Sequence, residues 1–154
     1  MKDAGLDQPT GGRFVGAEHR YPVRVFFEDT DLSGIVYHAN YLRFMERARS
    51  DMLRVAGVDQ RAAFEAGGGA YAVADLQIRY RAPARLDDAL LVVSRLRQVR
   101  AAGVVIHQQV RRAGEVLSDA TVTAALVSPS GRPQRQPAAW TAIYRNLLPA
   151  EELP

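Results

Sequence analysis

The chain has 154 residues, enough for one domain with a buried core, and its 47% apolar and 24% charged residues are typical of a globular protein. The absence of cysteine excludes disulfides, thiolate metal sites and a cysteine nucleophile, and a net charge of only +3 does not indicate a nucleic-acid-binding surface. Because no apolar run is long enough for a signal peptide or a membrane span, we expect a cytoplasmic protein.

The first predicted elements are a strand and one long helix. Residues 1–19 are polar and contain glycines, so we expect a flexible N-terminal segment. Residues 21–28 alternate apolar and polar side chains, which predicts a strand. From about residue 40 to Gly57 the apolar side chains recur at steps of three and four, which predicts an amphipathic helix that ends at a glycine cap. These apolar positions are Tyr41, Phe44, Met45, Ala48, Met52, Val55 and Ala56.

Four further strands are predicted in the second half of the chain. They cover residues 75–81, 90–99, 104–112 and 115–127. A tight turn at Ala113-Gly114 joins the last two, and Pro137 can start a short terminal helix. One helix and about five antiparallel strands predict an α+β domain in which the sheet wraps around the helix. We place this domain at residues 20–148 and a C-terminal tail at residues 149–154.

The densest group of polar side chains lies between the first strand and the long helix. Residues 28–38 hold three carboxylates, a histidine and two aliphatic hydroxyls, and we expect Asp29 to hold the loop backbone. The first N–H groups of a helix lack partners within it and can stabilise the oxyanion formed when a carbonyl is attacked. A neighbouring carboxylate could be a nucleophile or a general base. Plain helix caps use the same residue types, so the pattern alone leaves both interpretations open.

A longer motif in this region resembles a known family. The run from Val23 to Arg49, which contains D-T-D-L-S-G-I-V-Y-H-A-N-Y, is similar to the signature of the 4-hydroxybenzoyl-CoA thioesterase-like hotdog proteins. It is most similar to the acyl-CoA thioesterases associated with the Tol-Pal system of Gram-negative bacteria. Residues 80–88 and 131–135 also resemble this family, so the likeness spans roughly residues 21–137.

The resemblance implies a hotdog fold, which agrees with the predicted elements. It implies hydrolysis of acyl-CoA thioesters, or of acyl groups carried on an acyl carrier protein. No cofactor is expected, since coenzyme A is part of the substrate. Hotdog enzymes form their sites between two subunits, so a homodimer or homotetramer is also implied.

The same resemblance assigns roles to individual residues. Asp31 corresponds to the catalytic carboxylate, as a nucleophile or as a general base toward water. The backbone N–H of His38 is expected to polarise the thioester carbonyl, and its imidazole to assist. Tyr37 is grouped with these catalytic residues, and Gly34, which shapes the turn, with the substrate-binding residues. The branch often has tyrosine where this chain has Phe27, so a hydroxyl that could orient water or substrate is missing.

Two arginines and a glutamate are further candidates. Glu46 is a second candidate carboxylate, since related hotdog enzymes use a glutamate on the central helix, although it could instead pair with an arginine such as Arg43 or Arg49. Arg132 and Arg135 could contact coenzyme A phosphates or form a solvated basic turn. The three histidines show no metal-ligand spacing, so no metal is expected.

Two other functions remain open at this point. Hotdog hydratases and dehydratases place their aspartate and histidine in one motif on the central helix, whereas Asp31 precedes the helix. A non-catalytic acyl-binding or scaffolding module would still bind its ligand after Asp31 is replaced. The effect of replacing Asp31 therefore separates an enzyme from a binding module.

Overall fold

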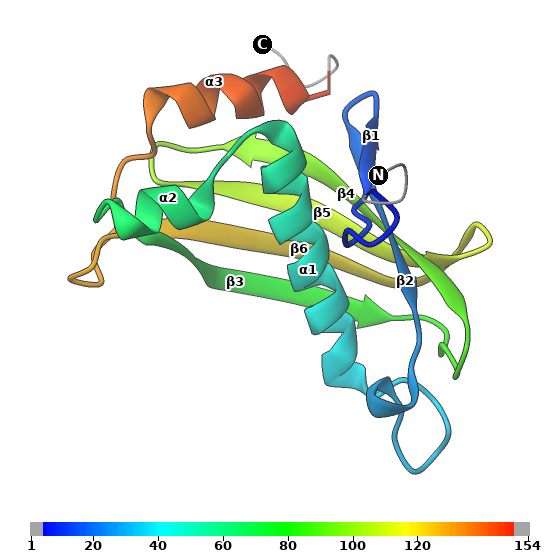
Figure 1. Ribbon diagram of the computed structural model, residues 1–154. Helices are drawn as coiled ribbons and strands as arrows, with labels where there is room; N and C mark the ends of the chain where they lie inside the picture. Colours follow the sequence, from blue (N-terminus) through cyan, green and yellow to red (C-terminus); the bar gives the residue numbers. More distant parts are fainter. Residues whose placement is uncertain (1–4, 150–154) are drawn as a thin grey trace.

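A six-stranded antiparallel sheet curves around one long helix in the computed structural model, which describes residues 5–149 (Figure 1). The strands are β1 (Arg13–Val15), β2 (Glu18–Arg24), β3 (Ala70–Tyr80), β4 (Ala89–Val99), β5 (Gly103–Arg112) and β6 (Glu115–Val127), in the order β1-β2-β4-β5-β6-β3. The helices are α1 (His38–Ala56), α2 (Gln60–Glu65) and α3 (Ala138–Leu147), and Phe27–Asp29 form a 3-10 turn. The predicted α+β architecture is confirmed, with one strand more than the five expected.

The long helix α1 packs its apolar face on strands β2, β4 and β5. Met45 and Ala48 are fully buried in this interface, and each large apolar side chain buried there contributes about 1.5–3 kcal/mol. Gly57 ends the helix in a left-handed conformation, as predicted. The helix begins at His38, about two residues earlier than expected, and Val55 is exposed although its position in the pattern suggested burial.

Part of the segment expected to be flexible is instead ordered, since β1 and the start of β2 lie within residues 1–19. The carboxylate of Asp51 on α1 accepts a hydrogen bond from the Gly12 N–H at 2.8 Å and contacts Nε2 of the fully buried His19 at 2.8 Å. A Cβ at Gly12 would lie 2.3 Å from the carbonyl oxygen of Arg20. The lack of a side chain at Gly12 therefore permits the close approach of the Arg20 carbonyl. The glycines of this segment had suggested flexibility instead.

The remaining predicted elements are mostly confirmed, with shifted ends. The hairpin turn at Ala113-Gly114 has both residues at positive φ, as a tight two-residue turn requires. Strand β3 begins five residues before the predicted strand at 75–81. The predicted tail lies outside the described residues, except for residue 149. Within residues 5–149, no helix combines the length and apolar character needed to cross a membrane.

Candidate active site

A buried carboxylate organises the loop between β2 and α1. Asp29 accepts hydrogen bonds from the Phe26 N–H and from the Asn40 side chain, both at 2.8 Å, and its carbonyl accepts one from the Tyr37 N–H at 2.8 Å. These contacts fold residues 27–29 into the 3-10 turn, so β2 ends at residue 24 and not near residue 28 as predicted. They also tie the loop to the first turn of α1. Asp29 thus holds the loop backbone, as expected from the sequence.

Asp31 lies exposed in the loop that Asp29 anchors. The Gly34 N–H donates to the Asp31 carbonyl at 3.0 Å, and Gly34 adopts a φ of +81° that favours glycine. The Asp31 carboxylate accepts hydrogen bonds from the hydroxyl of Ser33 and from its N–H, the latter at 2.8 Å. These two bonds lower the pKa of Asp31, and the charge of His38 adds a smaller effect in the same direction. Asp31 is therefore ionised near neutral pH, as a nucleophile or general base must be.

The helix start that follows has free donors. Tyr37 directly precedes α1, and no side chain of the described residues caps this end of the helix. The Asn40 N–H donates to the Tyr37 carbonyl at 2.8 Å, while helix geometry leaves the N–H groups of His38 and Ala39 without partners inside the helix. The positive end of the helix dipole adds to their affinity for a negatively charged oxygen.

Two aromatic rings flank the imidazole of His38. Its ring centroid lies 4.6 Å from that of Tyr37 and 6.2 Å from that of Tyr80, with the Tyr80 ring edge-on. A hollow of about 300 Å³ opens beside this end of the helix. Its lining residues are Ile35, Val36, His38, Tyr41, Tyr80, Arg81, Ala82 and Pro83. The hollow therefore lies against the first residue of α1.

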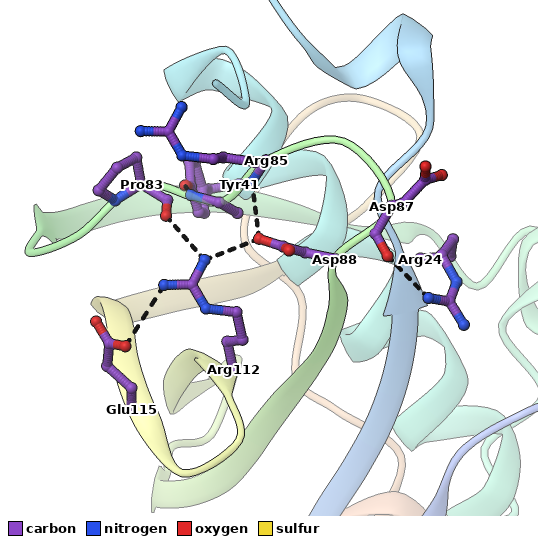
Figure 2. Close-up of polar contacts among 9 residues, drawn as sticks. Arg24, Tyr41, Pro83, Arg85, Asp87, Asp88, Arg112 and Glu115 are labelled. Atoms are coloured by element: carbon purple, nitrogen blue, oxygen red, sulfur yellow. Dashed lines mark hydrogen bonds and ion pairs between the residues drawn. The ribbon is translucent and has the colours of Figure 1, made fainter. Parts of the chain in front are cut away.

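One wall of the hollow is the turn between β3 and β4, shown in Figure 2. The Ala84 N–H donates to the Tyr41 hydroxyl at 2.9 Å, and the Ala84 carbonyl accepts the Val36 N–H at 2.9 Å. The Asp88 carboxylate accepts hydrogen bonds from the Arg85 N–H and from the Arg112 guanidinium, both at 2.8 Å (Figure 2). The wall is thus held by hydrogen bonds to α1, to the polar loop and to β5.

The second candidate carboxylate, Glu46, is an exposed side chain on α1. It pairs with Arg49 at 2.6 Å, and the buried Arg49 also donates to Gln108 at 2.9 Å. This is one of the two ion pairs that the sequence offered as the alternative to catalysis. Since Glu46 lies eight residues beyond His38, about 12 Å separates their positions along the helix axis.

The structure does not bring Arg132 and Arg135 to the start of α1 within one chain. Strands β3 and β6 pair from Ala70 opposite Val127 to Tyr80 opposite Ser118. The arginines follow the end of β6, so they lie near the start of β3, whereas Tyr80 contacts His38 at its other end. An eleven-residue strand spans roughly 30 Å.

Sequence reasoning missed Tyr80 and Tyr41 as parts of the site. Tyr80 was expected in a strand and Tyr41 on the core face of the helix, and both lie in stretches that resemble the family, but neither was given a role in the site. Their contacts depend on how β3 and the following turn pack against α1, and no local pattern reports that. The side chain of Phe27 is 82% exposed. The effect of the missing hydroxyl at this position on the reaction stays a prediction.

The family model described as the thioesterase-like superfamily matches residues 25–143. The chain belongs to the thioesterase-like superfamily. Among similar proteins, the acyl-CoA thioesterase YbgC of Haemophilus influenzae is 43% identical over 70% of this chain and 79% of its own length. The acyl-CoA thioester hydrolase YbgC of Escherichia coli is 38% identical over 82% of this chain and 96% of its own.

Similar solved structures share the fold. A probable thioesterase from Bartonella henselae superposes with a TM-score of 0.73 at 34% identity and covers 78% of this chain and 99% of its own. A DHNA-CoA thioesterase from Staphylococcus aureus reaches a TM-score of 0.78 over 84% of this chain and 90% of its own. Because the latter is 20% identical, it supports the fold alone. The predicted hotdog fold, family and enzyme class are confirmed.

Proposed function

We propose that this thioesterase hydrolyses acyl-CoA thioesters between Asp31 and the start of α1. The observation that carries the proposal is an exposed, ionised carboxylate seven residues before a helix start that no side chain of residues 5–149 caps. The hollow lined by His38 opens beside that helix start. Support for the substrate class comes from the relatives named acyl-CoA thioesterase and acyl-CoA thioester hydrolase, which are 43% and 38% identical to this chain.

The free donors of α1 suit the developing charge of the reaction. The thioester carbonyl oxygen would accept hydrogen bonds from the N–H groups of His38 and Ala39, which become stronger as the oxygen gains negative charge. Removing one such donor costs about 10²–10³-fold in rate in other enzymes. The thiolate of coenzyme A leaves readily, so the site needs no strong acid.

Asp31 supplies the attack on the carbonyl carbon by one of two routes. Direct attack gives a mixed anhydride and releases the thiolate, and water then cleaves the anhydride to regenerate Asp31. Alternatively, Asp31 takes a proton from a water molecule that attacks the same carbon. Either route requires the carboxylate to turn from Ser33 toward the helix. Because the side chain is exposed, it can make this rotation without losing buried contacts.

A homodimer would complete the site by pairing through β3. This strand forms one edge of the sheet in the described part of the chain, and it offers eleven residues for pairing. Two-fold symmetry would set two copies of β3 antiparallel, so that the start of one lies near the end of the other. Arg132 and Arg135 of one copy would then approach the start of α1 in its partner. There they would bind the phosphates of coenzyme A.

A panel of acyl-CoAs tests the proposal directly. Short-chain, long-chain and aromatic acyl-CoAs are incubated with the full chain, and free thiol is measured with a chromogenic disulfide. At least one class is expected to give steady release in proportion to enzyme, with kcat on the order of 1 s⁻¹ or more. If every class gives only the background rate, the chain is not an acyl-CoA hydrolase.

A further inference from the structure

Tyr80 makes a contact with the helix start that the proposed chemistry does not yet use. It is the last residue of β3, and its hydroxyl donates a hydrogen bond to the backbone carbonyl of His38 at 2.8 Å. Its ring also lies edge-on to the rings of His38, at 6.2 Å, and Tyr41, at 5.4 Å. The edge strand is thereby joined to the first residue of α1.

The carbonyl that Tyr80 contacts belongs to the first peptide unit inside the helix. In an α-helix this oxygen accepts the N–H of the residue four positions later, Leu42, and its second lone pair remains free. The Tyr80 hydroxyl occupies that second position. The N–H of the same peptide unit belongs to Ala39, one of the free donors at the helix start. A hydrogen bond to the carbonyl end of a peptide polarises the unit and strengthens its N–H as a donor.

We propose that Tyr80 is a positioning residue that orients and polarises the 38–39 peptide, so that the Ala39 N–H is aimed at the thioester oxygen. The inference rests on the proposed function, because it concerns the same helix start. Tyr80 acts through the backbone of the helix and does not itself touch the reacting atoms.

The surroundings of Tyr80 keep its hydroxyl in the donating form and in place. Burial raises the pKa of Tyr80, and Tyr41 raises it further, so the hydroxyl remains protonated throughout the neutral range. The turn that follows Tyr80 is held by the ion pair between Asp88 and Arg112 (Figure 2). The Tyr80 hydroxyl is therefore held in place by the pairing of β3 with β6 before it and by the anchored turn after it. Packing of the ring alone would not require the hydroxyl.

The test is the Tyr80→Phe variant of the full chain, which removes one oxygen and keeps the ring. We expect kcat for the best acyl-CoA to fall about tenfold while KM stays within about twofold, since the donor acts mainly on the transition state. The matched control is Tyr71→Phe, at the opposite end of the same strand. The Tyr71 hydroxyl contacts Gln136 and Tyr144. Its loss is expected to lower Tm by about 3 °C and to leave kcat unchanged.

A spectroscopic measurement separates positioning from a general structural role. In an Asp31→Asn background the thioester is bound but not cleaved, and the infrared stretch of its carbonyl reports the donors that it meets. Binding is expected to shift this stretch to lower frequency, and adding Tyr80→Phe is expected to reduce that shift. A variant with the kcat of the wild type, or with an unchanged carbonyl shift, would overturn the inference. Failure of the proposed function differs from this, because the wild type itself would then release no thiol.

Discussion

Replacing Asp31 by asparagine is expected to lower kcat for thiol release by about 10³-fold, in the range measured for the loss of a general base. The asparagine has the same shape and can still accept hydrogen bonds from Ser33, so the loop should keep its fold. It cannot attack the carbonyl or take a proton from water. Thiol release under saturating acyl-CoA, together with Tm and oligomeric mass, measures the effect.

Two matched variants serve as controls for this experiment. Asp59 caps α2 through the Ala62 N–H, far along the chain from the site, and asparagine caps equally well. Asp59→Asn should therefore retain wild-type kcat. Glu46→Gln weakens the pair with Arg49 and should lower Tm, with kcat changed less than about threefold. If Glu46→Gln lost activity while Asp31→Asn kept it, the catalytic carboxylate would be Glu46 and not Asp31.

Mixing two inactive variants is expected to restore activity if the site is shared between copies. The double variant Arg132→Ala and Arg135→Ala should lose about 100-fold in kcat/KM, because each arginine would bond a charged phosphate. Asp31→Asn should be inactive for the separate reason given above. In a randomly mixed dimer population, about a quarter of the sites would combine an intact Asp31 with intact arginines from the partner. Thiol release below KM should rise to that fraction of the wild-type rate.

The control for this experiment is a mixture of Asp31→Asn with wild type, which should keep about half of the sites active under any arrangement. If the arginines serve the site of their own chain, the two defective variants form no intact site together. Activity would then remain at the sum of the separate variants. That result would contradict the shared site and leave the role of Asp31 untouched.

The elements that periodicity could predict were the ones whose burial follows a regular pattern. The face of α1 was predicted because Phe44, Met45 and Ala48 recur at helical spacing and meet the sheet. The local pattern marked the polar loop before the helix start, and the resemblance to the hotdog thioesterases singled out Asp31 within it, whose catalytic role stays a prediction. The role of Asp29 in the loop backbone followed from its position in the chain.

The features that the sequence could not predict depend on long-range contacts. Gly12 suggests flexibility when it is considered alone, and only the neighbouring Arg20 carbonyl and Asp51 from α1 show that it lies in a close contact. Tyr80 reaches His38 because β3 lies at the edge of the sheet and ends beside the helix. The large separation of Arg132 from the helix start follows from the register between β3 and β6. Each of these depends on tertiary packing that local propensity does not encode.

The most direct measurement is a crystal structure of the Asp31→Asn variant with an uncleaved acyl-CoA. We expect the thioester oxygen within about 3 Å of the N–H groups of His38 and Ala39. The side chain at position 31 should lie against the carbonyl carbon on the other side. A thioester bound beside Glu46, or held away from the start of α1, would show that the reaction does not take place between Asp31 and this helix start.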